Sequence, residues 1–121
     1  MKVRAIRGAV TCSANTEQDI LNETRELLIG IVEKNSIREN DIISIIFTVT
    51  NDLNAAFPAV AARSMGWTDI PLMCSNEIPV PGSLEKCIRV MMHINTEKDN
   101  KDIKHVFLKG ARSLRPDLSQ D

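Results

Sequence analysis

Residues 42–50 read IISIIFTVT, a run of β-branched and apolar residues with little polar interruption. Such a run predicts a strand that is covered on both faces, because a strand with one solvated face would alternate apolar and polar side chains. This strand therefore needs a layer of structure on each side, and the rest of the chain must supply those layers.

The segments around this strand predict the other elements of a single sheet with helices. Residues 2–10 alternate in character and predict a strand, whereas residues 16–34 carry an apolar stripe at helical spacing behind Thr16, a suitable N-cap. Pro58 suits the first turn of a short helix that ends near Gly66. Further strands are predicted at 69–74, in the second half of 84–95, and at 103–110.

The order β-α-β-α-β-β-β predicts an α+β domain with α/β-type layers, in which a mixed β-sheet carries two helices on one face. Two helices cannot cover both faces of the strand at 42–50, so self-association in a closed symmetric oligomer is the simplest completion. All 121 residues are expected to form one domain. The polar C-terminal stretch, about residues 112–121, is expected to be a flexible tail.

Charge and cysteine content exclude several classes of protein. Fifteen basic and sixteen acidic residues give a net charge of −1, which argues against a nucleic-acid or membrane-surface binder. Three widely spaced cysteines fit neither a disulfide framework nor a zinc site, and no apolar segment approaches the ~20 residues of a membrane span. No nucleotide-binding glycine motif occurs. We expect a cytoplasmic protein with reduced thiols, no metal and no organic cofactor.

Three arginines in apolar surroundings are the candidates for chemistry. Arg7 has the alternative of a structural ion pair, and Arg63 that of a solvated helix residue. Arg89 is harder to explain as structural, because its desolvation within CIRVMM costs several kcal/mol unless a partner is present. Glu77 precedes a rigid loop, whereas Cys74 alone is more often a small buried hydrophobe than a nucleophile. The residues by themselves predict only an oligomeric domain suited to an anionic ligand.

Six segments resemble a known family. They are VRAIRGA at 3–9, DLNAAFPAVAAR at 52–63, GW at 66–67, IPLMCSNEIPV at 70–80, LEKCIRVMMHINT at 84–96, and HVFLKGA with LRPDL within 105–118. These segments run nearly end to end, and CIRVMM and LRPDL are the most specific. The chain resembles the monofunctional, trimeric class of bacterial chorismate mutases.

The resemblance implies a homotrimeric pseudo-α/β-barrel with active sites between neighbouring subunits. The implied activity is that of an isomerase that rearranges chorismate to prephenate in the shikimate pathway, for phenylalanine and tyrosine biosynthesis. The residues implied as catalytic are Arg89, Glu77, Arg7 and Cys74. Those implied to bind substrate are Arg7, Arg63, Phe57, Ala59, Met73, Cys74, Phe107 and Leu114.

The same resemblance implies a role for each charged group. Arg89 is expected to stabilise negative charge on the ether oxygen in the transition state, and Arg7 to bind a substrate carboxylate. Glu77 is expected to accept a hydrogen bond from the ring hydroxyl, with Cys74 beside it. Phe107 stands where the family commonly has a tyrosine, which is expected to weaken substrate binding more than turnover.

Val60 is a second departure from the family, because a lysine often occupies this position and would add a cation to the cleft rim. Two other functions stay open. One is a non-catalytic trimer that senses an aromatic-pathway acid. The other, an enamine or imine deaminase on a similar barrel, has less support because the sequence lacks its arginine motif.

Overall fold

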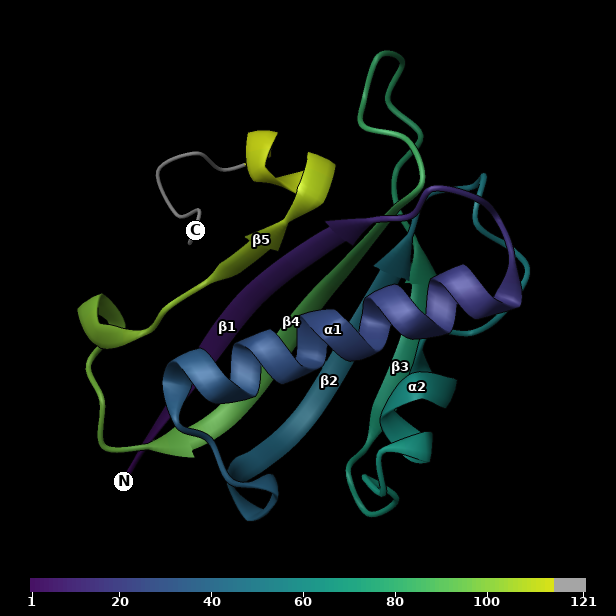
Figure 1. Cartoon of the computed structure of the whole chain (residues 1–121). Coiled ribbons are helices and arrows are strands. Elements are labelled where there is room, and N and C mark those ends of the chain that lie inside the picture. The colour runs from purple at the N-terminus through teal and green to yellow at the C-terminus, as the bar shows by residue number, and fades with distance from the viewer. Residues whose placement is uncertain (115–121) are drawn as a thin grey trace.

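The computed structural model describes residues 1–114, and it has the predicted order of elements (Figure 1). In chain order these are β1 (Lys2–Thr11), α1 (Glu17–Asn35), β2 (Ile42–Val49), α2 (Ala59–Ser64), β3 (Leu72–Asn76), β4 (Cys87–Thr96) and β5 (Val106–Leu108). Short 3₁₀ helices occupy Glu39–Asp41, Asn100–Asp102 and Lys109–Ser113. Most of the tail predicted at about 112–121 lies outside the described residues.

The five strands form one mixed sheet in the order β3-β2-β4-β1-β5. β4 pairs antiparallel with β1 and β2, while β3 runs parallel to β2 and β5 runs parallel to β1. The register sets Ala9 of β1 and Thr48 of β2 opposite Arg89 of β4. Arg89 therefore lies in the central strand with a neighbour on each side, and its side chain is fixed relative to both.

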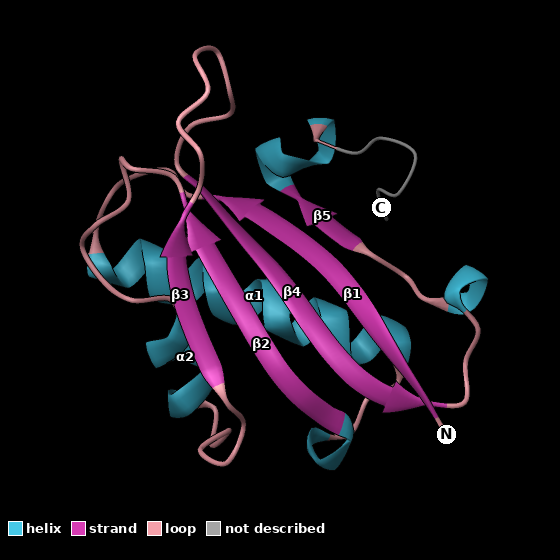
Figure 2. Ribbon diagram, turned by 180° about the vertical axis from the view of Figure 1, so that it is seen from behind, coloured by secondary structure: helices cyan, strands magenta, loops and turns pink. Residues whose placement is uncertain are grey.

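Both helices lie on one face of the sheet, as predicted (Figures 1 and 2). Helix α1 begins after Thr16, whose side chain accepts a hydrogen bond from the Asp19 backbone N–H. Strand alternation directs one set of apolar side chains toward the helices. The fully buried members of this core include Ile6, Val10, Ile20, Leu27, Leu28, Ile31, Ile45, Phe47, Ile88 and Met92.

Gly8 allows α1 to lie close to β1. A Cβ at this position would lie 2.8 Å from Ile31 Cδ1 and 3.2 Å from the Val106 carbonyl oxygen. The absence of a side chain therefore lets the helix approach the strand that carries Arg7.

Two strand predictions need correction. The strand predicted at 69–74 begins only at Leu72 and extends to Asn76, because its ladder with β2 starts where Leu72 pairs with Ile45. It is an edge strand, as Pro71 predicted. The strand predicted at 103–110 is limited to Val106–Leu108, because Lys109 has a φ of 55° and starts a 3₁₀ helix. That helix also includes the first residues of the tail that was expected to be flexible from about residue 112.

The second face of the sheet carries no α-helix in residues 1–114 (Figure 2), although Ala111 of the 3₁₀ helix Lys109–Ser113 packs against Ala9 and Cys87 on this side. Alternation places Val3, Ile46 and Met73 on this face, where they are 59%, 37% and 63% exposed. The strand at 42–50 was predicted to be covered on both faces, and a single chain covers only one of them. The helix-free face also carries Arg7 and Arg89.

Candidate functional site

Three of the predicted charged residues meet on the helix-free face. Arg7 and Arg89 project from adjacent strands, and their registers place them diagonally across the β1–β4 ladder. Glu77 directly follows β3, and its backbone N–H donates to the Val49 carbonyl oxygen at 2.8 Å. Together they border an open hollow of about 560 Å³. Its lining comprises Arg7, Gly8, Ala9, Ile46, Thr48, Glu77, Arg89, Val90 and Met91.

The Arg89 guanidinium is close to a carboxylate yet retains an unused donor. Arg89 Nε lies 3.6 Å from Glu77 Oε1, and the two side chains are 27% and 26% exposed. Within the described chain, Nε is buried and has no hydrogen-bond partner. A buried donor without an acceptor costs about 1–3 kcal/mol. This N–H therefore lacks an acceptor within the described chain.

The other carboxylate oxygen of Glu77 is held by a residue that the sequence analysis did not single out. The Thr48 hydroxyl donates a hydrogen bond to Glu77 Oε2. The sequence contained a sign of this role. Thr48 has a polar hydroxyl within the apolar run IISIIFTVT, and it is two residues from Ile46, so both side chains face the same side of the sheet. It was overlooked because isolated threonines are ordinary strand residues.

The guanidinium of Arg7 lies over an aromatic ring, which helps to hold it in place. Its Cζ lies 5.8 Å from the centre of the Phe107 ring, and its backbone N–H donates to His105 Nδ1 at 2.9 Å. Phe107 is only 1% exposed, because it packs with Ala9, Cys87 and Ala111. In the single chain Phe107 therefore lies against Arg7, and Leu114 packs against the cluster that holds the ring.

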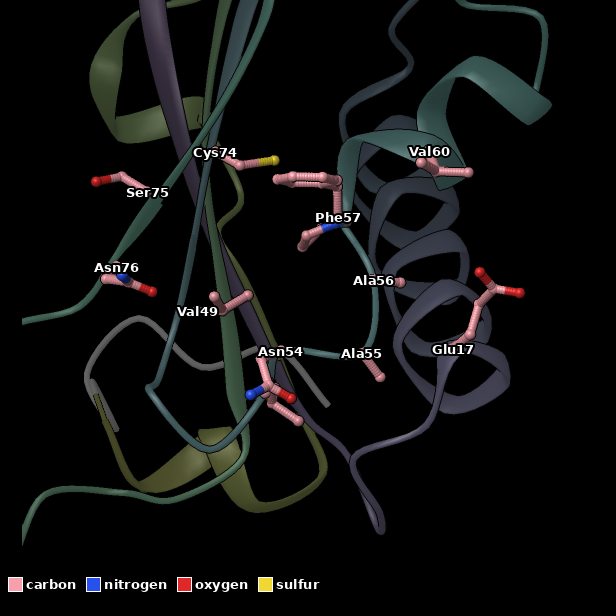
Figure 3. Close-up of a pocket in the computed structure, with 12 residues that line it drawn as sticks. Glu17, Val49, Asn54, Ala55, Ala56, Phe57, Val60, Cys74, Ser75 and Asn76 are labelled. Carbon is pink, nitrogen blue, oxygen red and sulfur yellow. The ribbon is translucent and has the colours of Figure 1, made fainter.

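A second pocket, of about 500 Å³, lies on the other side of β3 (Figure 3). The Cys74 sulfur points toward the ring of Phe57, which is 69% exposed, and Val60 lies at the rim. The remaining lining residues are Glu17, Val49, Leu53, Asn54, Ala55, Ala56, Pro58, Ser75 and Asn76.

The predicted site residues thus divide between two places. Cys74 packs toward the helix-covered core, whereas Glu77, three positions later, borders the hollow on the opposite face. An odd separation along a strand reverses the direction of the side chain, so one chain does not place Cys74 beside Glu77.

Three other predicted substrate-binding residues line neither pocket. Met73 lies on the helix-free face near the edge of the sheet. Arg63 is exposed on α2, and Ala59 is buried in the first turn of the same helix. In the single chain these residues remain separate from the arginines of the hollow.

The two fully enclosed thiols are unsuited to nucleophilic chemistry. Burial, with the charge of Glu23 as a smaller cause, raises the pKa of Cys12 to about 12. Burial also raises the pKa of Cys87 to about 11, although the Arg89 charge opposes this shift. Both thiols remain protonated near neutral pH. All three cysteines are free.

Two other types of site are not found in residues 1–114. Residues 1–114 contain no group of three histidine, cysteine, aspartate or glutamate side chains placed to hold a metal ion. None of the helices in the same part of the chain is long and apolar enough to cross a membrane.

The comparisons with known proteins agree with one another. The sequence model of the family described as chorismate mutase type I matches residues 3–118. Chorismate mutase AroH of Bacillus subtilis is 44% identical over 120 residues, covering 98% of this chain and 94% of that protein. Chorismate mutase AroH of Thermus thermophilus is 47% identical over 117 residues, covering 96% of each.

A solved structure gives the same relationship in three dimensions. The chain superimposes on a chorismate mutase from Clostridium thermocellum with a TM-score of 0.90 and 68% sequence identity. The match covers 91% of this chain and 98% of that one. The five-stranded sheet and both helices thus have a close counterpart of known structure.

Proposed function

Because this chain belongs to the chorismate mutase type I family, we infer that it is an isomerase that converts chorismate to prephenate. The reaction is an intramolecular Claisen rearrangement, in which a C–O bond breaks while a C–C bond forms. It involves no external nucleophile and no redox change, so the protein must act by binding one conformer and stabilising developing charge. The product belongs to phenylalanine and tyrosine biosynthesis.

The observation that carries this proposal is the unused Nε–H of Arg89. Cleavage of the C–O bond runs ahead of C–C bond formation, so negative charge grows on the ether oxygen. A guanidinium aimed at that oxygen stabilises the transition state more than the ground state, which is the condition for catalysis. Arg89 suits this role because it remains charged at any working pH and is held in the central strand.

The other charged groups of the hollow orient the substrate. Chorismate is a dianion, and Arg7, which lies over Phe107, provides a cation for one carboxylate. Glu77 provides an acceptor for the ring hydroxyl. With this pair, the hollow has both a cationic and an anionic wall, and the dianion has one preferred orientation in it.

We assign the second pocket to the same active site, through a neighbouring chain. The hollow and the Phe57–Cys74 pocket open on opposite sides of the edge strand β3. In a closed homotrimer, the hollow of one chain meets the second pocket of the next, and the exposed apolar residues of the helix-free face become covered. Cys74, Phe57 and Val60 then complete the site from the second chain. Arg63 and Ala59 of α2 approach it from the same chain, as does Met73 of the edge strand β3.

The remaining features concern affinity and location. Phe107 and Val60 remove a hydroxyl and a cation that relatives commonly provide, so substrate binding is weaker and the reaction is unchanged. The chain acts as one domain over residues 1–121, in the cytoplasm, without a metal or an organic cofactor. Neither departure replaces Arg89, the group assigned to the reacting ether oxygen, or Glu77, the group assigned to the ring hydroxyl.

The test is turnover of chorismate by the purified protein, followed as loss of ultraviolet absorbance, with prephenate identified by chromatography. Saturable conversion is the expected result. A folded protein that binds chorismate without converting it would overturn the proposal and favour a sensor. Sedimentation velocity on the same sample measures the oligomeric state, for which three chains are expected.

A further inference from the structure

We propose that Thr48 is a positioning residue that holds Glu77 away from Arg89, so that the Arg89 Nε–H stays free for the substrate. The inference rests on the proposed function of Arg89 and Glu77. Thr48 lines the hollow opposite Arg89, and its hydroxyl donates to the Glu77 carboxylate, through which it acts.

The backbone brings these three side chains to one place. Thr48 and Arg89 are directly opposite each other in the β2–β4 ladder, and both face the hollow. Glu77 is anchored to the same strand, because its N–H donates to the carbonyl of Val49, the residue after Thr48. Residues from three adjacent strands thus meet around one carboxylate.

The carboxylate is shared unequally between its two neighbours. Thr48 donates to Oε2, whereas Oε1 lies 3.6 Å from Arg89 Nε, beyond ordinary hydrogen-bond length. A charge-assisted N–H···O bond would be about 2.7–2.9 Å long. A small rotation of the Glu77 side chain would therefore close this bond, and the Thr48 hydroxyl opposes that rotation.

A hydrogen bond from the Arg89 Nε–H to Glu77 Oε1 would lower the rate of the reaction. Glu77, which already forms an ion pair with Arg89 at 3.6 Å, would then occupy the Nε–H donor and compensate the positive charge more closely before the substrate oxygen develops negative charge. The loss would fall on the transition state more than on the bound substrate, because the oxygen is only weakly charged in the ground state.

The hydroxyl of Thr48 has no substitute within the described part of β2. Ser44 lies on the same strand and at the same parity, but its Oγ contacts His93 Nδ1 at 3.3 Å. The neighbour of Thr48 on the hollow face is Ile46, which offers no polar atom. Ser44 therefore provides a matched control, in which a hydroxyl is removed from the same strand without contact with Glu77.

The experiment compares Thr48→Val, Thr48→Ser and Ser44→Ala with the wild-type protein. Valine keeps the branched shape and strand preference of threonine while removing the donor, and serine restores the donor. We expect kcat to fall about 10- to 100-fold in Thr48→Val with a smaller change in KM, as for the loss of a hydrogen bond to a charged group. Thr48→Ser and Ser44→Ala should stay near wild-type kcat.

A second measurement is independent of activity. The ¹H–¹⁵N resonance of Arg89 Nε, assigned by its loss in Arg89→Lys, reports whether this N–H gains an acceptor. We expect it to move downfield in Thr48→Val and to remain in place in Ser44→Ala. An unchanged resonance in Thr48→Val, or wild-type kcat in that variant, would overturn the role of Thr48.

The two measurements separate this inference from the proposed function. A wild-type protein without turnover contradicts the mutase activity, yet the Nε resonance still shows whether Thr48 restrains Glu77. Turnover in the wild type with no response to Thr48→Val contradicts only the restraint. Urea unfolding of each variant confirms that the compared proteins are folded.

Discussion

The guanidinium of Arg7 lies over the ring of Phe107, with Cζ 5.8 Å from the ring centre. The ring is itself fixed, because it is 1% exposed and packs with Ala9, Cys87 and Ala111. A strand arginine is therefore supported by a buried aromatic side chain on the neighbouring parallel strand β5. This support is the reason to expect that Phe107 contributes to substrate affinity without touching the substrate.

We predict that Phe107→Leu raises KM for chorismate about 2- to 30-fold and changes kcat less. The range corresponds to a cation–π contact of about 0.5–2 kcal/mol. Steady-state kinetics measures both parameters. Phe107→Tyr, which keeps the ring, should retain or improve KM. A wild-type KM in Phe107→Leu would show that the ring does not position Arg7.

Replacement of Arg89 by alanine should abolish measurable turnover and leave the protein folded. The loss of a single oxyanion donor costs about 2.7–4 kcal/mol, or 10²–10³ in kcat. Alanine also removes the charge, so the decrease should be at the upper end of that range or beyond it. Near-native kcat in Arg89→Ala would contradict the assignment.

Arg89→Lys is the informative companion variant. Lysine keeps a positive charge but lacks the rigid fork of donors. Its kcat should exceed that of Arg89→Ala and remain well below that of the wild type, because a mobile ammonium is not preorganised toward the ether oxygen. Circular dichroism and sedimentation should show the wild-type fold and assembly in both variants.

The element order was predictable because each element carries its own periodicity. The alternation in residues 2–10 predicted the observed strand β1, and the helical stripe in residues 16–34 predicted the observed helix α1. The last strand was overpredicted because alternation alone does not reveal a left-handed residue such as Lys109. That conformation is set by tertiary packing, including the hydrogen bond from the Gly110 N–H to the Thr11 hydroxyl.

The resemblance led us to expect three of the charged candidates near one another, but not the separation of the other candidates from them. Arg7, Glu77 and Arg89 do border one hollow. The family resemblance implied that Cys74 lies beside Glu77, yet strand parity directs the two side chains of one chain to opposite faces. Thr48 was missed because its importance comes from the β2–β4 register, which no local pattern specifies.

Alkaline pH should destabilise the protein through its buried thiols. The folded-state pKa of Cys87 is raised from 9.0 to about 11, so the folded chain keeps a proton that the unfolded chain loses above pH 9. The stabilisation is complete below pH 9 and is lost as pH rises toward 11. The unfolding free energy should fall by about 1.4 kcal/mol per pH unit from this group.

Urea unfolding at fixed protein concentration between pH 8 and 10.5 measures this slope. Cys87→Ala should have the shallower dependence on pH, because it retains only the similar contribution of Cys12. The chain has no tyrosine, and every other ionisable group is the same in the two proteins. Parallel slopes for wild type and variant would show that Cys87 is not protected from ionisation.

Two inactive variants should restore activity when they are mixed, if each active site is shared between chains. Arg89→Ala damages the hollow, whereas Phe57→Asp places a negative charge in the second pocket, where it repels the dianion. Phe57 is 69% exposed, so this change leaves the core intact. In randomly exchanged trimers, about a quarter of the interfaces combine an intact hollow with an intact pocket.

The matched control mixes Arg89→Ala with Arg7→Ala. Both changes lie in the same hollow, so each chain carries one damaged hollow and no interface can be complete. Activity after urea-assisted subunit exchange should therefore return to about a quarter of wild type in the first mixture, and stay at the level of the separate variants in the second. Recovery in neither mixture would place the whole site within one chain, and recovery in both would mean that the two arginines act in different sites.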